Sequence, residues 1–260
     1  MARILNDDLC VTTDKSAQRS DVALAARVAA DLGALCVVRN GRSIAYHLTK
    51  THKSAALVVA QGVITLSLNT KSYGFHPNMA ARRIRAPQDS FAIAADLKPG
   101  DHVLDLTCGM GADAIIAAHY VGTKGRVDAL EASAVLAWIV SQGLAHYDTK
   151  EPLRSAMRRI NLRHMHARDA LENMADSSVD VVVLDPMFPH ARRGADGLSL
   201  VRAFALHELP DAGLIDQAKR VARKNVVMSD SATGARLAAL GFARVTQNRT
   251  KCWGRIEVSA

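Results

Sequence analysis

Apolar residues in the first part of the chain alternate between short continuous runs and stretches with helical spacing. The runs predict strands at 9–13 and 35–39, the helical spacing predicts helices at 16–32 and 43–51, and two further runs predict a hairpin around Gln61-Gly62. Ser16 is the predicted cap of the first helix, because a serine side chain accepts a hydrogen bond from the free N–H groups of a first turn. We expect these elements to form a small α/β domain, which together with a basic connecting segment covers residues 1–88.

From Asp101 onward the pattern becomes a strand, a tight turn and a helix, repeated several times. Strands are predicted at 102–106, 126–131, 162–167, 179–185 and 225–229, and helices at 112–120, 134–146, 152–160, 214–223 and 231–240. The last residues, 242–249 and 251–259, alternate in period two and predict an antiparallel hairpin. Strands that alternate with helices form a mostly parallel sheet with helices on both faces. We therefore expect a second domain, residues 89–260, with a doubly wound sheet that this hairpin closes.

The composition is that of a globular protein with a sizeable core. Of the 260 residues, 49% are hydrophobic and 22% are charged, which is an ordinary balance. No apolar run approaches the ~20 residues that cross a bilayer, and the first ten residues, MARILNDDLC, have acids where a signal peptide has its apolar segment. The four cysteines form no CxxC pair, and His164 and His166 have no further ligands beside them, so neither disulfides nor a metal site is predicted. We expect a cytoplasmic protein without a membrane segment.

The net positive charge of the chain indicates what kind of partner it binds. A net charge of +8 and a pI near 9.6 favour a polyanion such as nucleic acid, although a basic balance also serves solubility. The basic residues cluster at Arg82, Arg83 and Arg85, at Arg154, Arg158, Arg159 and Arg163, and at Arg192 and Arg193. Aromatic residues are few, which argues against a single-strand binder that stacks bases on aromatic platforms.

In a doubly wound sheet, ligands bind beyond the carboxyl ends of the strands, so the strand ends are the place to search. The first strand of the second domain ends in DLTCGMGADA, residues 105–114. Gly109 and Gly111 allow a tight turn and a close approach of a ligand to the backbone, and the free N–H groups of the following helix suit a carboxylate or phosphate. Alone, a Gly-x-Gly turn is a weak signal.

Four successive strands of this domain end on an acid, at Asp105, Glu131, Asp169 and Asp185. Any one of them has an alternative role as a helix cap, but the repetition favours a shared ligand. The glycines followed by Glu131 also fit a dinucleotide fingerprint. Asp105, however, would repel a pyrophosphate and attract an ammonium group. A ligand with an amino acid at one end and adenosine at the other suits these acids, and S-adenosylmethionine is such a ligand.

The strand that ends at Asp185 runs into an unusual loop, VVVLDPMFPH, residues 181–190. An exocyclic amine of a base is a poor nucleophile, because its lone pair is delocalised into the ring. Asp185 and the carbonyl of Pro186 can accept hydrogen bonds from such an amine and align it, and Phe188 can stack on the base. The alternative is a strand terminator with Phe188 packed in the core.

At these residues the sequence resembles a known family. The motif DxTxGxG, the second strand that ends on Glu131, and especially LDPMFPH resemble ribosomal RNA small subunit methyltransferase J and its relatives, over about residues 73–229. The resemblance implies a class I methyltransferase fold, Rossmann-like, that uses S-adenosylmethionine to methylate the exocyclic amine of a guanosine in 16S rRNA. The segments IRAPQDS and ARRGADGLSLVRAF depart from the family pattern, and the first seventy residues do not match its well-known members.

The resemblance places the cofactor contacts at Ala112, Asp113, Glu131, Ala132, Arg168, Asp169 and Asp185. The motif residues Asp105, Thr107, Gly109 and Gly111 complete the predicted cofactor site. The predicted catalytic residues are Asp185, Pro186 and Phe188, and the predicted nucleic-acid contacts are His76, Arg82, Arg83, His190, Arg192 and Arg193. For His76 a turn role, and for the basic loop a solvated surface, are the alternatives.

Two other functional classes stay open from the sequence. One is catalysis on a different amine, in DNA adenine, tRNA or a protein amide, because fold alone does not separate these substrates. The other is a non-catalytic RNA-binding protein that keeps the methyltransferase fold. The intact Asp185-Pro186-x-Phe188 segment favours catalysis, since a pure binder would not need an amine clamp.

Overall fold

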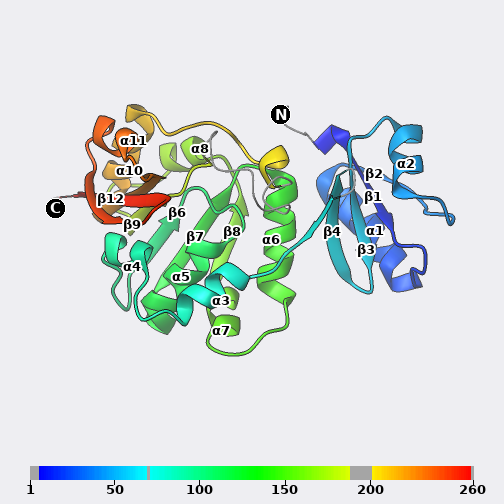
Figure 1. The fold of residues 1–260 in the computed structure, drawn as a ribbon, viewed down its shortest axis with the longest axis horizontal. Coiled ribbons are helices and arrows are strands. Elements are labelled where there is room, and N and C mark those ends of the chain that lie inside the picture. Colours follow the sequence, from blue (N-terminus) through cyan, green and yellow to red (C-terminus); the bar gives the residue numbers. More distant parts are fainter. Residues whose placement is uncertain (1–5, 69–70, 188–200, 259–260) are drawn as a thin grey trace.

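The computed structural model describes residues 6–68, 71–187 and 201–258, which form two sheets (Figure 1). The first sheet has five strands in the order β2-β1-β3-β4-β5. Its elements are η1 (Asn6–Asp8), β1 (Leu9–Thr13), α1 (Arg19–Leu32), β2 (Leu35–Cys36), α2 (Ile44–Thr51), β3 (Ala55–Ala60), β4 (Val63–Leu68) and β5 (Lys71–Gly74). Strands β2, β1 and β3 are parallel, and β4 pairs antiparallel with β3 on one side and with β5 on the other. Helices α1 and α2 pack against the two faces, α2 on Cys10, Ala56 and Val58.

The predicted hairpin and most boundaries of this unit are confirmed. Gln61 and Gly62 both have positive φ, 51° and 74°, as a tight two-residue hairpin turn requires. Helix α1 begins at Arg19 rather than at Ser16. The reason is local, because the backbone N–H and hydroxyl of Ser16 both donate to the carboxylate of Asp14 and hold a turn before the helix.

The second sheet has seven strands in the order β11-β12-β10-β9-β6-β7-β8. The strands are β6 (His102–Asp105), β7 (Arg126–Glu131), β8 (Ile160–His164), β9 (Val179–Leu184), β10 (Ala222–Ser231), β11 (Ala243–Gln247) and β12 (Lys251–Glu257). The first five are parallel, and the final hairpin is antiparallel, which confirms the predicted fold class. The strand order reverses at β6, which pairs with β7 on one side and with β9 on the other. A ligand crevice is expected at such a reversal.

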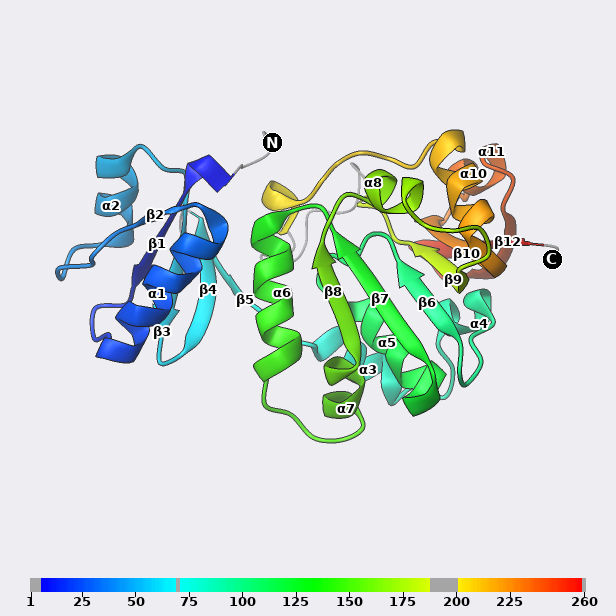
Figure 2. The ribbon, with the colours of Figure 1, turned by 180° about the vertical axis from the view of Figure 1, so that it is seen from behind.

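Helices cover both faces of this sheet and complete its core (Figure 2). They are α3 (Asn78–Ile84), α4 (Ser90–Ala95), α5 (Ala112–Val121), η2 (Gly122–Lys124), α6 (Ala134–His146), α7 (Leu153–Arg158), α8 (Ala167–Glu172), α10 (Ala212–Val221) and α11 (Ala235–Ala239). Strand β9 is apolar at nearly every position because helices bury both of its faces. None of the helices in the described ranges is long and apolar enough to cross a membrane. The four cysteines are free thiols.

The two sheets are joined by helix α6, which stands between them in both views (Figures 1 and 2). Val135, Leu136 and Ile139 of α6 belong to the same buried cluster as Leu57 and Leu66 of the first sheet. The indole N–H of Trp138 also donates to Asp31 of α1 at 3.2 Å. The predicted division at residue 88/89 stays a prediction; α3, which precedes it, packs its Ala80 into the core of the second sheet.

The chain passes from the first sheet to the second through Phe75, whose ring packs against both cores. This ring lies directly on the backbone of Gly143 in α6, so that a Cβ at Gly143 would overlap it. Only glycine therefore lets the connecting segment approach α6 this closely.

Gly143→Ala is expected to lower the free energy of unfolding by about 1–3 kcal/mol, because overpacking against Phe75 outweighs the gain in helix propensity of about 1 kcal/mol. Urea unfolding followed by circular dichroism measures this change. In a Phe75→Ala background, where the ring is gone, the same substitution should be neutral or stabilising. Equal effects in both backgrounds would refute the contact.

Candidate active site

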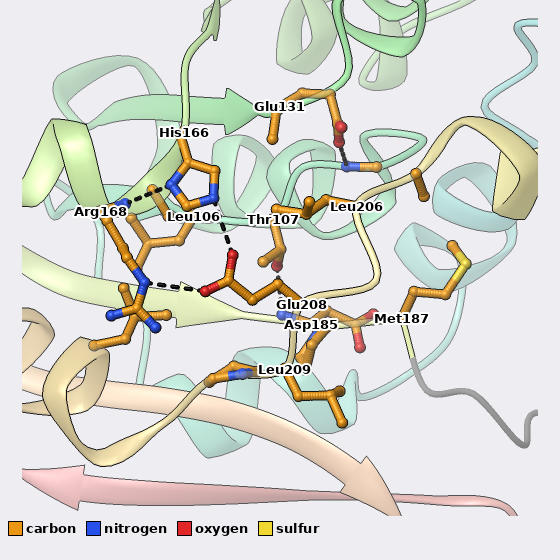
Figure 3. A pocket seen from close by; sticks show the side chains of 17 residues that line it. Leu106, Thr107, Glu131, His166, Arg168, Asp185, Met187, Leu206, Glu208 and Leu209 are labelled. Carbon is orange, nitrogen blue, oxygen red and sulfur yellow. Dashed lines mark hydrogen bonds and ion pairs between the residues drawn. The ribbon is translucent and has the colours of Figure 1, made fainter. Parts of the chain in front are cut away.

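A pocket opens at the carboxyl ends of β6, β7 and β9, where the order of the second sheet reverses (Figure 3). The loop after β6 supplies one wall, the start of α8 a second, and the segment at residues 205–210 a third. The lining residues are Leu106, Thr107, Gly109, Glu131, Ala132, His166, Ala167, Arg168, Asp185, Pro186, Met187, Ala205, Leu206, Glu208, Leu209, Pro210 and Leu214. The pocket thus combines an apolar surface with a few convergent polar groups, as small-molecule sites usually do.

The glycine turn is fastened to the end of the neighbouring strand. The backbone N–H of Gly109 donates to one carboxylate oxygen of Glu131 at 2.9 Å, and that of Ser133 donates to the other at 2.8 Å. Gly111 has φ +79° at the start of α5, and a Cβ there would lie 3.4 Å from Val140. The positive φ therefore favours glycine at this position, while a Cβ there would make only ordinary contact with Val140.

Four carboxyl groups gather at this edge of the sheet, namely Asp105, Asp113, Glu131 and Asp185. Burial raises the pKa of Asp105 well above its ordinary value, and the other three acids nearby raise it further. The backbone N–H of Thr107, at 2.9 Å from Asp105, opposes this shift. Such a concentration of buried acids suits a positively charged ligand, since a cation would relieve their mutual repulsion.

Asp185 is held at both carboxylate oxygens and at its backbone. The ammonium of Lys251 lies 2.7 Å from one oxygen, and the hydroxyl of Ser229 donates to the other. The backbone N–H of Asp185 donates to the hydroxyl oxygen of Thr107 at 2.6 Å. Burial by itself would raise the pKa of Asp185, but Lys251 and the hydrogen bonds outweigh it and hold that pKa below its ordinary value. These contacts therefore keep the carboxylate of Asp185 ionised and fix its orientation.

Lys251 is positioned in turn by its neighbours. It begins β12, where Ser231 of β10 is its antiparallel partner, and its ammonium lies 4.3 Å from the centre of the Trp253 ring. The carboxylates of Asp185 and Asp113 raise the pKa of Lys251 despite its burial. A charged lysine at this position on β12 balances the acids.

Arg83 was predicted to contact nucleic acid, and in the structure it is paired with two protein carboxylates. Its guanidinium pairs with Asp89 at 2.7 Å and with Asp113 at 2.6 Å, and its side chain is only 20% exposed. Asp113 also hydrogen-bonds to Asp185, and burial raises the pKa of Asp113. The donors of Arg83 are thus taken up by protein carboxylates, and its role is to support the acidic site.

The third wall of the pocket is tied down by Glu208. Figure 3 shows His166 and Arg168 both directed toward its carboxylate, at 3.3 Å and 3.1 Å. Arg168 also pairs with Asp211 at 2.8 Å, just before α10. These three contacts fix the segment at 205–210 over the start of α8.

The pocket brings together seven of the residues predicted from the sequence, namely Thr107, Gly109, Glu131, Ala132, Arg168, Asp185 and Pro186. Asp105, Gly111, Ala112 and Asp113 lie directly behind this lining, on β6 and the first turn of α5. Asp169, by contrast, is exposed in the first turn of α8 and does not line the pocket. Of the predicted nucleic-acid contacts, His76 and Arg82 are exposed. Phe188, His190, Arg192 and Arg193 lie outside the described residues.

Sequence reasoning missed Lys251, Ser229, His166 and Glu208. The period-two pattern predicted the strand that begins at Lys251 but gave no sign that its ammonium meets Asp185. His166 was considered only as a metal ligand and set aside. For Glu208 no motif was available, because its partners are distant in sequence.

Lys251→Met is expected to lower the free energy of unfolding at pH 7 by about 1–3 kcal/mol, since it leaves Asp185 without its charged partner. Because the pKa of Asp185 is lowered in the folded protein, this stabilisation is present above the unfolded value near 3.9 and is lost as the pH falls through the folded value. Urea unfolding at pH 7 and pH 3.5 should therefore show a difference between variant and wild type that shrinks at the lower pH. Lys219→Met, which breaks an exposed pair with Asp216, is the control and should cost at most about 0.5 kcal/mol at either pH. A pH-independent loss would contradict the electrostatic account.

Comparisons with known proteins agree with this geometry. The chain is 34% identical over 240 residues to "Uncharacterized protein YpiP" of Bacillus subtilis, which covers 89% of this chain and 92% of that protein. It is 36% and 38% identical to "Ribosomal RNA small subunit methyltransferase J" of Pseudoalteromonas atlantica and of Cronobacter sakazakii. Each of these two matches spans 48% of this chain and about half of the relative's length, 51% and 50%.

The fold also matches a solved structure. A SAM-dependent methyltransferase from Neisseria gonorrhoeae superposes with a TM-score of 0.64 over 96% of both chains, at 18% identity. Residues 45–251 match the model of the family described as "Putative SAM-dependent methyltransferase". With the acid-rich pocket at the reversal of the sheet, this match means that the chain belongs to the family of methyltransferases that use S-adenosylmethionine.

Proposed function

We propose that this methyltransferase acts on an exocyclic amine of a nucleic-acid base, and specifically on guanine N2 in 16S rRNA. The observation that carries the proposal is the state of Asp185 at the mouth of the pocket. An ionised carboxylate, fixed by Lys251 and Ser229 and followed by Pro186, is what the alignment of a weakly nucleophilic amine requires.

The residues around the pocket fit the cofactor. S-adenosylmethionine carries a methyl group on a positively charged sulfur and supplies it to a nucleophile. We assign Asp105 to the ammonium group of the cofactor and Glu131 to its ribose hydroxyls, because a carboxylate accepts both kinds of donor. Ala132, Ala167 and Leu214 provide an apolar surface for adenine.

The acceptor amine is held from the opposite side in this proposal. Asp185 and the carbonyl of Pro186 accept its two N–H donors, which directs the nitrogen lone pair toward the methyl group. With the cofactor bound, its methyl group would pass to this nitrogen, and the ionised Asp185 would take up the proton that the nitrogen gives up. Correct placement of reactants can be worth roughly 7–11 kcal/mol, so positioning accounts for most of the expected acceleration.

The choice of RNA rests on two further observations. Several matched relatives bear the name ribosomal RNA small subunit methyltransferase J, and their matches cover about half of this chain. The net charge of +8 also favours a polyanionic substrate. The exposed Arg82 on α3, next to the half-buried Arg83 that pairs with Asp113, is our proposed phosphate contact near the site.

The experiment that tests the proposal is incubation of the protein with tritiated S-adenosylmethionine and three acceptors, namely undermethylated 30S subunits or 16S rRNA, tRNA, and duplex DNA. We expect label in 16S rRNA that digests to N2-methylguanosine. Label confined to tRNA or DNA would show that this nucleic acid, and not 16S rRNA, is the substrate. Tight cofactor binding without any label would favour a binding role.

Asp185→Ala is expected to lower kcat on the labelled acceptor on the order of 10²–10⁴-fold, because the amine loses its aligning acceptor. Cofactor affinity, measured by calorimetry, should change little. Asp185→Asn keeps one acceptor oxygen and should retain part of the activity. Asp216→Ala, which removes an exposed ion-paired carboxylate, is the matched control. Near-normal turnover of Asp185→Ala would refute the proposal that Asp185 aligns the acceptor amine.

A further inference from the structure

The positive charge of the protein is concentrated in one segment. The chain has 33 Lys and Arg against 25 Asp and Glu. Between Leu32 and Gln88 there are eight basic residues, namely Arg39, Arg42, Lys50, Lys53, Lys71, Arg82, Arg83 and Arg85, and no acid at all. Since 33 less eight leaves 25, the rest of the chain is neutral. The whole excess of +8 therefore belongs to residues 33–87, which include α2 and α3.

Within this stretch, helix α2 has an outer face that its packing leaves uncovered. Its inner face, Ile44, His47 and Leu48, packs on the first sheet. On the outer face lie Tyr46 and Lys50, one helical turn apart, and the guanidinium of Arg42 lies 5.2 Å from the Tyr46 ring. Tyr46 is 45% exposed. We call Arg42, Tyr46 and Lys50 the α2 patch.

The turn before α2 fixes the position of this patch. The backbone N–H of Arg42 donates to the carbonyl of Arg39 at 3.0 Å, and the Nε2 of His47 hydrogen-bonds to the same carbonyl at 2.9 Å. The hydroxyl of Ser43 accepts from the backbone N–H of Tyr46 at 3.0 Å and caps the helix. The patch thus lies on an ordered turn, and this order lowers the entropic cost of binding a ligand.

The cations of the patch are not neutralised from within. Among residues 6–68, 71–187 and 201–258, no carboxylate forms an ion pair with Arg42 or Lys50. On the second domain, by contrast, Arg168, Arg220 and Arg223 each have such a partner. Lys53 is excluded from the patch because its ammonium binds the backbone carbonyl of Asp7.

We infer that the α2 patch is a docking surface for the phosphate backbone of the substrate RNA, at a distance from the target base. This inference rests on the proposed action on RNA. Arg42 and Lys50 bind phosphates, and the exposed ring of Tyr46 stacks on an unpaired base. Helix α2 lies on the side of the first sheet that faces away from α6 (Figures 1 and 2), so the patch contacts a part of the RNA remote from the pocket. The first domain thereby adds affinity without touching the reacting atoms.

The test compares two double variants of the full chain. Arg42→Gln/Lys50→Gln removes the two cations of the patch. Lys124→Gln/Lys150→Gln removes two exposed cations, one at the end of η2 and one before α7, at the other end of the second domain from the pocket. Both variants change the net charge equally. The affinity for a fluorescent 16S rRNA transcript is measured from 50 to 300 mM KCl, together with cofactor affinity and the melting temperature.

The patch variant is expected to bind the transcript about tenfold more weakly at physiological salt, and its plot of log K against log salt should be less steep by about 1.4–1.8, the value for two lost phosphate contacts. Cofactor affinity and melting temperature should stay those of the wild type, and the control variant should bind RNA as the wild type does. An unchanged slope, or an equal loss in the control, would overturn the docking surface.

Two further outcomes separate this inference from the proposed chemistry and from other partners. Patch-dependent RNA binding without methyl transfer would support the docking surface and refute the activity. Methyl transfer to RNA with an unchanged kcat/KM in the patch variant would support the activity and refute the docking surface. Binding to phosphatidylglycerol vesicles that the patch variant loses, with RNA binding intact, would assign the surface to a membrane and overturn the inference.

Discussion

The ion pair between Lys251 and Asp185 is the interaction on which the site of this protein depends. Burying several carboxylates in one place is costly, because each loses its hydration and repels the others. Asp105, Asp113 and Asp185 are nevertheless buried or half-buried together at the reversal of the sheet. Lys251 meets this group from β12, and Arg83 meets it from α3. These acids are therefore stabilised by cations from the connecting segment and from the last strand.

This arrangement makes the final hairpin part of the site. In many doubly wound sheets an added edge hairpin only completes the packing. Here β12 pairs with β10 in a register that sets Trp253 opposite Ser229 and Lys251 opposite Ser231. The same register brings both the hydroxyl of Ser229 and the ammonium of Lys251 to Asp185. A shift by one residue would turn Lys251 to the other face of the sheet, so the hairpin register and the ionisation of Asp185 are linked.

The first domain is linked to the pocket by packing. Its apolar face shares one core with α6 and with Val201, Ala203 and Phe204. Those residues lead directly into the segment at 205–210 that forms the third wall of the pocket. A displacement of the first domain would therefore act on that wall, which the contacts of Glu208 with His166 and Arg168 hold in place. The connecting residue Phe75 packs on both cores and limits such a displacement.

Much of the fold follows from signals that are local in the chain. The alternation of apolar runs and helical spacing predicted most strands and helices, since each period reflects the geometry of a single element. The Gln61-Gly62 hairpin and the Gly109 turn were visible because positive φ favours particular residues. Three of the four predicted strand-end acids, Asp105, Glu131 and Asp185, do come together, because parallel strands bring their carboxyl ends to a common edge, whereas Asp169 is exposed and lies outside the pocket.

The sequence by itself thus determined the type of sheet, the edge at which the pocket lies, and three of the acids that gather there. Only the tertiary structure decided which cations balance those acids and which side chains close the pocket. Asp185 and Lys251 are 66 residues apart, Arg168 and Glu208 are 40 apart, and Arg83 and Asp113 are 30 apart. No periodic pattern relates residues at such separations. Their contacts arise from strand register and helix packing, which the whole folded chain determines.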